Sequence, residues 1–264
     1  ITGIQSLGVM TDMPGLMVRF EREQRLPWRT RIATGIIKWC LNNFKKYVFL
    51  TEAMNVVNER KRPYIVMEGM SDRFMATYKR PFEAKDIKVV MYAGGLHERY
   101  GLKKLTEAFM MLPQENFRLK LFGSGPFVEK LKTKYTKKDS RIQYMGVAPN
   151  AEVVAAELDA SLLVNPRPTH EEFTKYSFPS KNIEYMASGT PLLTTKLPGM
   201  PKEYYPYVFL IENESVEGYA KALERVLAQS DEELYVFGEK AKDFVLEKKN
   251  SFEQAKRVIE LIKL

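Results

Sequence analysis

The chain has 264 residues, a formal net charge of +8, 45% apolar residues and a single cysteine. This length supports one large or two modest domains with a proper hydrophobic core, and the apolar content excludes a disordered chain. A lone cysteine excludes an internal disulfide, so we expect a reducing compartment, the cytoplasm.

The positive charge is compatible with nucleic acid, an anionic membrane surface or phosphorylated ligands. The sequence has no Cys/His finger and no aromatic RNA-binding strand signature, and its basic residues are dispersed, so we expect no nucleic-acid partner. No apolar run approaches the ~20 residues that span a bilayer, and no secretory signal opens the chain. Because the sequence begins without Met, inside a predicted strand, we expect an amino-terminal part to be missing.

The first residues predict a strand over 2–12, a helix over 26–44 and a strand from residue 46 that continues into a helix over 52–60. The helix over 26–44 mixes apolar residues such as Trp28 and Trp39 with basic ones. This pattern favours a core helix with a solvated basic edge; the alternative is a helix whose basic edge rests on anionic lipid. Residues 71–80 are polar and irregular, which indicates a domain boundary near 70–85.

From residue 88 strands and helices alternate regularly. Such repetition predicts an α/β fold, a doubly wound parallel sheet with helices on both faces. Strands are predicted over 88–95, 117–125, 142–146, 160–166, 191–195 and 208–211, and helices over 102–111, 126–136, 151–158, 215–229, 231–247 and 251–263.

The chain is organised around residues 176–196, which predict a loop, a short helix, a tight turn and a buried strand. Pro179 suits the first helical turn, Ser177 or Ser180 can cap it, and Gly189 ends it. A helix that starts at the carboxyl edge of a parallel sheet favours anions. Lys181 would add a cation there and Glu184 would accept hydrogen bonds from sugar hydroxyls, a combination that suits a nucleotide-sugar. The alternative is an ordinary capped surface helix.

Other candidate binding residues follow the earlier strands, where ligands collect in doubly wound domains. Taken alone, glycine pairs after strands mostly form tight turns without a ligand. The residues are Gly94, Gly95 and Arg99 after the strand over 88–95, Gly123 and Gly125 after the next, and Gly146 and Val147 after the third; a fourth turn, over 165–172, leads into the central helix.

The segment SFPSKNIEYMASGTPLL, residues 177–193, resembles the donor-binding signature of family 4 glycosyltransferases with the GT-B fold, especially bacterial capsule and exopolysaccharide enzymes. The resemblance implies a complete carboxyl-terminal, Rossmann-like donor domain over 76–264 and a remnant of the amino-terminal acceptor domain over 1–75. It implies transfer from a UDP- or GDP-sugar to a saccharide or lipid-linked saccharide, retention of configuration and no obligatory metal. If the basic edge of the helix over 26–44 rests on anionic lipid, the protein would lie on the inner face of the membrane, which would suit a lipid-carried acceptor. A terminal helix that crosses back to the first domain is also expected.

The resemblance assigns donor binding to Ser177, Phe178, Pro179 and Ser180 as well as to Lys181 and Glu184. Three positions depart from the family pattern: Gly95 and Tyr100 stand where the family has a phosphate-binding Arg and Lys, and Tyr176 replaces the first of two glutamates. We therefore expect Lys181, Arg99 and Tyr176 to be the catalytic residues. The departures leave open a non-catalytic nucleotide-binding or partner-binding subunit; an epimerase or phosphorylase fits the motif less well.

Overall fold

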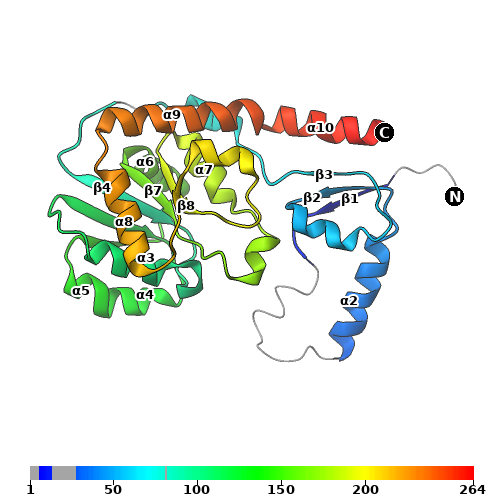
Figure 1. Ribbon diagram of the computed structural model, residues 1–264, viewed down its shortest axis with the longest axis horizontal. Helices are drawn as coiled ribbons and strands as arrows, with labels where there is room; N and C mark the ends of the chain where they lie inside the picture. Colours follow the sequence, from blue (N-terminus) through cyan, green and yellow to red (C-terminus); the bar gives the residue numbers. More distant parts are fainter. Residues whose placement is uncertain (1–5, 14–27, 81) are drawn as a thin grey trace.

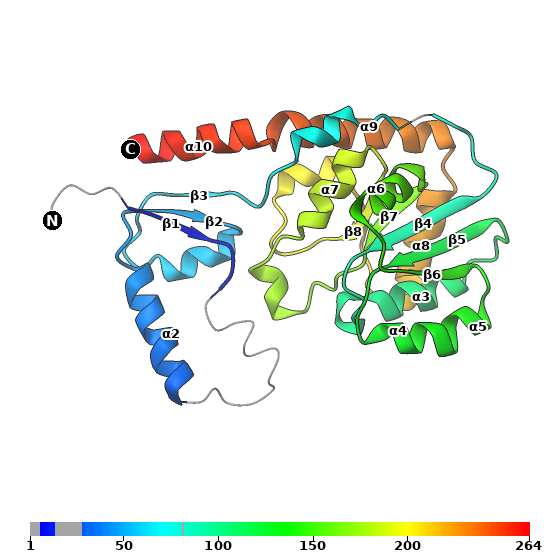
Figure 2. The same cartoon turned by 180° about the vertical axis from the view of Figure 1, so that it is seen from behind.

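The computed structural model describes residues 6–13, 28–80 and 82–264, and these form two separate parallel sheets (Figures 1 and 2). Residues 2–5 of the predicted strand over 2–12 and residues 26 and 27 of the predicted helix over 26–44 lie outside the described residues. The small sheet has the order β1-β2-β3, and the large one has the order β6-β5-β4-β7-β8-β9. The strands are β1 Leu7–Met10, β2 Lys46–Phe49, β3 Tyr64–Val66, β4 Lys88–Ala93, β5 Phe117–Phe122, β6 Ile142–Gly146, β7 Leu162–Asn165, β8 Leu192–Thr195 and β9 Phe209–Ile211.

Helices cover both faces of the large sheet, as Figure 1 shows. Successive strand residues alternate between the two cores: Val90 and Tyr92 of β4 pack with α3, α4 and α8, whereas Val89 and Met91 pack with α6, α7 and α9. The helices are α2 Trp28–Leu41, α3 Leu102–Met110, α4 Phe127–Lys130, α5 Thr136–Lys138, α6 Asn150–Asp159, α7 Ser180–Ser188, α8 Val216–Leu227, α9 Asp231–Lys248 and α10 Ser251–Lys263.

The order of the large sheet creates a switch point between β4 and β7. The chain runs from β4 outward through β5 and β6, then returns to β7 and continues outward through β8 and β9 on the other side. Loops after β4 and β7 therefore leave in opposite directions, and a ligand crevice is expected between them. The predicted doubly wound α/β fold is confirmed.

The terminal helix returns to the small sheet, as expected (Figure 1). In α10 the Arg257 guanidinium donates to the Val66 carbonyl at 2.7 Å, and the Lys46 ammonium of β2 donates to the Ile262 carbonyl at 2.6 Å. Where α9 meets α10, the buried Lys249 ammonium lies 2.6 Å from a carboxylate oxygen of Glu68, which follows β3. These polar contacts tie the two sheets together.

The helix α2 is not a core helix, so that expectation is wrong. Trp28 is 66% exposed and Trp39 69%, and Ile32 and Ile36 are also exposed. A periodic apolar pattern cannot say what covers it, and among the described residues nothing covers this face. None of the described helices is long and apolar enough to cross a membrane.

Candidate functional site

Glycines allow the turns after β4, β5 and β6 to pack backbone against backbone. A Cβ on Gly123 (φ 124°) would lie 1.9 Å from the Gly94 carbonyl oxygen, and the Gly123 amide donates to the Gly146 carbonyl at 2.7 Å. A Cβ on Gly125 would similarly meet the Leu96 carbonyl oxygen at 2.4 Å. The structure thus brings the predicted glycine turns together at one edge of the sheet, and close backbone approach explains them.

Two predicted residues at this edge remain open to solvent. Gly95 is exposed, and Val147 is 76% exposed after β6. Across the switch point, a Cβ on Gly101 would lie 1.8 Å from the Pro166 carbonyl oxygen, so the start of α3 abuts the loop after β7. The edge therefore has an exposed rim above a tightly packed base.

The helix α7 ends at Gly189 in the left-handed region (φ 79°), as predicted, but it begins at Ser180, so Pro179 lies just before the first helical turn and not in it. The predicted serine cap is wrong: no side chain caps this helix, because Pro179 occupies the N-cap position. The Ser177 hydroxyl is instead buried without a hydrogen-bond partner among the described residues. Phe178 is buried against Tyr204, with ring centroids 5.1 Å apart, and anchors the loop that leads into α7.

Lys181 and Glu184 lie one turn apart on α7 and form an ion pair of 3.0 Å. Both side chains are about one third exposed, so this pair is weak and can open when a ligand competes. The Lys181 ammonium also lies 5.9 Å from the centroid of the Tyr185 ring, whose hydroxyl donates to the Ala93 carbonyl at the end of β4. Both predicted residues are therefore close to the carboxyl edge of the sheet.

A fully buried carboxyl, Glu157 of α6, lies behind this pair. Neither of its oxygens has a hydrogen-bond partner among the described residues. Burial, with a smaller contribution from the nearby Glu184 charge, raises the pKa of Glu157 to about 8, and Lys181 opposes the shift. Sequence reasoning missed this residue because one glutamate in a helix gives no sign of burial.

Tyr176 packs against the apolar cluster of the small sheet, which contains Tyr47 and Phe49. One residue earlier, the Thr51 hydroxyl after β2 donates to the Lys175 carbonyl at 2.8 Å. Tyr176 thus lies where the two sheets meet, and its predicted catalytic role stays a prediction.

Arg99 is joined by an arginine that the sequence did not single out, Arg167. The guanidinium carbon of Arg99 lies 5.3 Å from the ring centroid of Tyr100 and 5.9 Å from that of Phe173; for Arg167 the distances are 5.0 and 5.4 Å. We call these four residues the arginine–aromatic cluster. The one available signal for Arg167 was its position two residues after β7.

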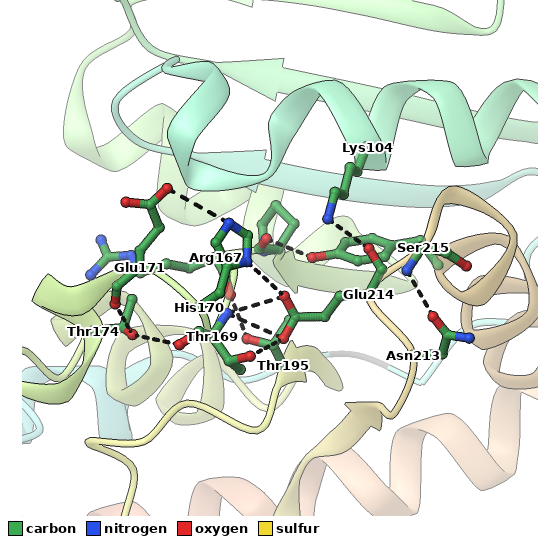
Figure 3. A network of polar contacts seen from close by, with 12 residues as sticks. Lys104, Arg167, Thr169, His170, Glu171, Thr174, Thr195, Asn213, Glu214 and Ser215 are labelled. Carbon is green, nitrogen blue, oxygen red and sulfur yellow. Dashed lines mark hydrogen bonds and ion pairs between the residues drawn. The ribbon is translucent and has the colours of Figure 1, made fainter.

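A polar network fixes the loop after β7 that carries Arg167 (Figure 3). The Glu214 carboxylate accepts from the Thr169 amide at 3.1 Å and also from its hydroxyl. The Thr195 hydroxyl donates to the Arg167 carbonyl at 2.5 Å, and the Tyr219 hydroxyl donates to the Pro166 carbonyl at 2.8 Å. These contacts from β8, from α8 and from the turn before α8 hold the loop in place.

The carboxyl edge of the large sheet carries backbone amides and positively charged side chains that could bind a phosphate. No group of three His, Cys, Asp or Glu side chains that could hold a metal occurs within residues 6–13, 28–80 and 82–264. The groups available to an anion are the start of α7, Lys181, Arg99 and Arg167.

A family model described as Glycosyl transferases group 1 matches residues 76–262. The chain belongs to this family. No curated protein matches it. The match covers the whole large sheet and the terminal helices, and the α/β fold with parallel sheets is of the GT-B type, as expected.

Solved structures of other glycosyltransferases show the same fold at low sequence identity. Sucrose-phosphate synthase from Thermosynechococcus elongatus is 18% identical, with a TM-score of 0.72, and the alignment covers 99% of this chain and 68% of the synthase chain. A TarM variant from S. aureus is 15% identical, with a TM-score of 0.72 and coverages of 98% and 51%. HepE from Anabaena is 12% identical, with a TM-score of 0.69 and coverages of 97% and 71%. The chain thus spans between half and about 70% of these relatives.

Proposed function

We propose that the protein transfers a sugar from a nucleotide-diphosphate sugar to a saccharide or lipid-linked saccharide acceptor, with retention of configuration, as a family 4 enzyme of capsule or exopolysaccharide synthesis. The observation that carries the proposal is the glycine-lined, cationic edge of the sheet beside the start of α7, in a chain of the group 1 family. Residues 76–264 would form the donor domain and residues 1–75 part of the acceptor domain.

Departure of the nucleotide leaves negative charge on the diphosphate, so groups that bind this charge more strongly in the transition state accelerate transfer. In our proposal the α7 amides and the Lys181 ammonium lie beside the phosphates, while Glu184 accepts hydrogen bonds from ribose hydroxyls. The existing ion pair of these residues, 3.0 Å long, would then open as each side chain turns to its own part of the donor. With this much positive charge supplied by the chain, no metal would be obligatory.

The donor would be a UDP- or GDP-sugar. The structure of HepE is described as a complex with UDP and glucose, and that of a trehalose-6-phosphate protein from E. coli as bound with UDP-2-fluoro glucose. These relatives support a uridine nucleotide as the first donor to test, and GDP-sugars as the second.

We also propose that α2 rests on the inner face of an anionic membrane. Trp28, Ile32, Ile36 and Trp39 share one helix face, and α2 contains no acidic residue but has the exposed Arg29 and Arg31. Exposed Trp residues beside basic ones suit the interface of an anionic bilayer. A Trp28→Ser, Trp39→Ser double variant should lose sedimentation with phosphatidylglycerol vesicles, and unchanged sedimentation would contradict this proposal.

One observation favours a second candidate, a non-catalytic nucleotide-binding or partner-binding subunit. Tyr176 stands where the family has the first glutamate, and it packs against the small sheet. A subunit of this kind would bind UDP or GDP without hydrolysing or transferring the sugar.

The test uses the complete protein with UDP- and GDP-sugars, and follows both transfer and slow donor hydrolysis. We expect Lys181→Ala to lower turnover about a hundredfold, since loss of one preorganised charge-stabilising group typically costs this much. Lys137→Ala, an exposed lysine of α5, is the matched control. A near-wild-type rate for Lys181→Ala would defeat the role of this lysine, and binding without any turnover would favour the non-catalytic subunit.

A further inference from the structure

Two guanidinium groups lie together at the switch point without an opposing charge. Arg99 and Arg167 each contact the rings of Tyr100 and Phe173, and among the described residues neither guanidinium donates a hydrogen bond or pairs with a carboxylate. The Nε atoms of both are buried without a partner. Figure 3 shows the polar network of the loop, in which the contacts of Arg167 are made by its backbone.

Two other arginines with little exposed surface, Arg141 and Arg80, have partners for their guanidinium groups. Arg141 forms an ion pair of 2.7 Å with Asp139 and donates to two carbonyls. Arg80, which is 9% exposed, donates to the carbonyls of Gly189 and Ala160. An unpaired buried charge is costly, and buried charges normally have a partner.

The surroundings of the pair work against its charge. Burial lowers the pKa of Arg167 below its ordinary value, and the like charge of Arg99 lowers it further. The aromatic rings attract the guanidinium groups but carry no counter-charge. Two adjacent positive charges are therefore held in a position that an anion with two negative charges would stabilise.

The pair also has the position and rigidity of a binding element. Arg99 follows β4 and Arg167 follows β7, so they come from the two sides of the switch point. The loop of Arg167 is fixed by Thr195, Glu214 and Tyr219, and it continues through Phe173 to the start of α7. A rigid loop reduces the entropy lost when a ligand binds.

We propose that Arg167, together with Arg99, binds the diphosphate of the nucleotide-sugar from the side opposite α7. This inference rests on the proposed function and deepens it. The planar guanidinium donors form paired hydrogen bonds with phosphate oxygens, and two of them match the two charges of a nucleotide-diphosphate sugar. Lys181 has to leave its ion pair with Glu184 to reach the phosphates, whereas the arginine pair has no carboxylate partner to leave among the described residues.

The test measures binding of UDP, GDP, uridine and guanosine to the complete protein, by calorimetry for the diphosphates and by competition for the nucleosides. Arg167→Gln should weaken binding of the preferred diphosphate about tenfold or more, the usual cost of losing a hydrogen bond to a charged group, and leave nucleoside binding unchanged. Arg167→Lys, which keeps the charge but loses the planar fork, should lose less. Arg225→Gln, in which an exposed arginine of α8 is replaced, is the control.

A thermal melt of each variant separates binding from folding. Arg167→Gln removes an uncompensated charge, so its melting temperature should not fall. If Arg167→Gln bound the diphosphate with wild-type affinity, the inference would be overturned and the proposed function would stay intact. The same holds if the variant melted at a lower temperature and lost affinity equally for the diphosphate and the nucleoside. If the wild-type protein bound neither UDP nor GDP, the proposed function itself would fail.

Discussion

Replacing Glu157 with glutamine should remove a pH dependence of stability that the wild-type protein carries. The carboxyl is fully buried, its oxygens have no hydrogen-bond partner among the described residues, and its pKa is about 8 against an ordinary value of 4.5. Below pH 4.5 the carboxyl is protonated in both the folded and the unfolded chain, so it costs no stability. As the pH rises toward 8, the unfolded chain releases this proton and the folded chain keeps it, so the free energy of unfolding falls.

The size of the effect follows from the two pKa values. The loss is about 1.4 kcal/mol per pH unit across this interval, or about 4–5 kcal/mol in total. Glutamine imitates the protonated carboxyl and does not titrate. Between pH 5 and pH 7, the wild-type protein should therefore lose about 2–3 kcal/mol relative to Glu157→Gln.

Urea unfolding at a series of pH values measures this difference directly. Glu152→Gln, on the exposed side of the same helix, is the matched control. If the difference in unfolding free energy between Glu157→Gln and wild type stayed constant from pH 5 to pH 8, Glu157 would ionise freely in the folded protein. That result would refute the reasoning from its burial.

Three further predictions concern the junction and the turns. Lys249→Met should lower the free energy of unfolding in urea by about 3–5 kcal/mol, because the carboxylate of Glu68, 2% exposed, then keeps only the Tyr204 hydroxyl as a partner. Adding Glu68→Gln to Lys249→Met should recover part of this loss. Equal stability of the single and the double variant would contradict the prediction. Gly123→Ala should lower stability by about 3 kcal/mol or more, because its Cβ would meet the Gly94 carbonyl oxygen. Gly146→Ala, where nothing lies within 4 Å of the new Cβ, should cost only about 1 kcal/mol for its φ of 78°, so similar melting temperatures for these two variants would argue against the packed turns.

Much of the fold could be predicted because the large sheet is strongly periodic. Strands such as β4 and β5 are apolar runs that end in glycines, and regular alternation with amphipathic helices indicates βαβ units. The helix α2 shows the limit of such patterns. Its apolar residues predict burial, but only the surrounding chain decides whether Trp28 and Trp39 are covered.

The candidate site was predicted where a motif is continuous in sequence and missed where contacts are made at long range. The segment around Lys181 and Glu184 was identified, and their spacing of three also allows the ion pair that the structure shows. Arg167 was missed because its relation to Arg99 depends on rings from two different loops, Tyr100 and Phe173. The prediction that Ser177 caps α7 was wrong, because Pro179 occupies the N-cap position and the Ser177 hydroxyl is buried without a partner among the described residues.

The central claim is that a diphosphate binds between the start of α7 and the arginine–aromatic cluster. A crystal structure of the complete protein with UDP or GDP tests it most directly. The account predicts phosphate oxygens within ~3 Å of α7 amides and of the Arg167 guanidinium. A nucleotide bound elsewhere, with its phosphates away from both elements, would contradict it.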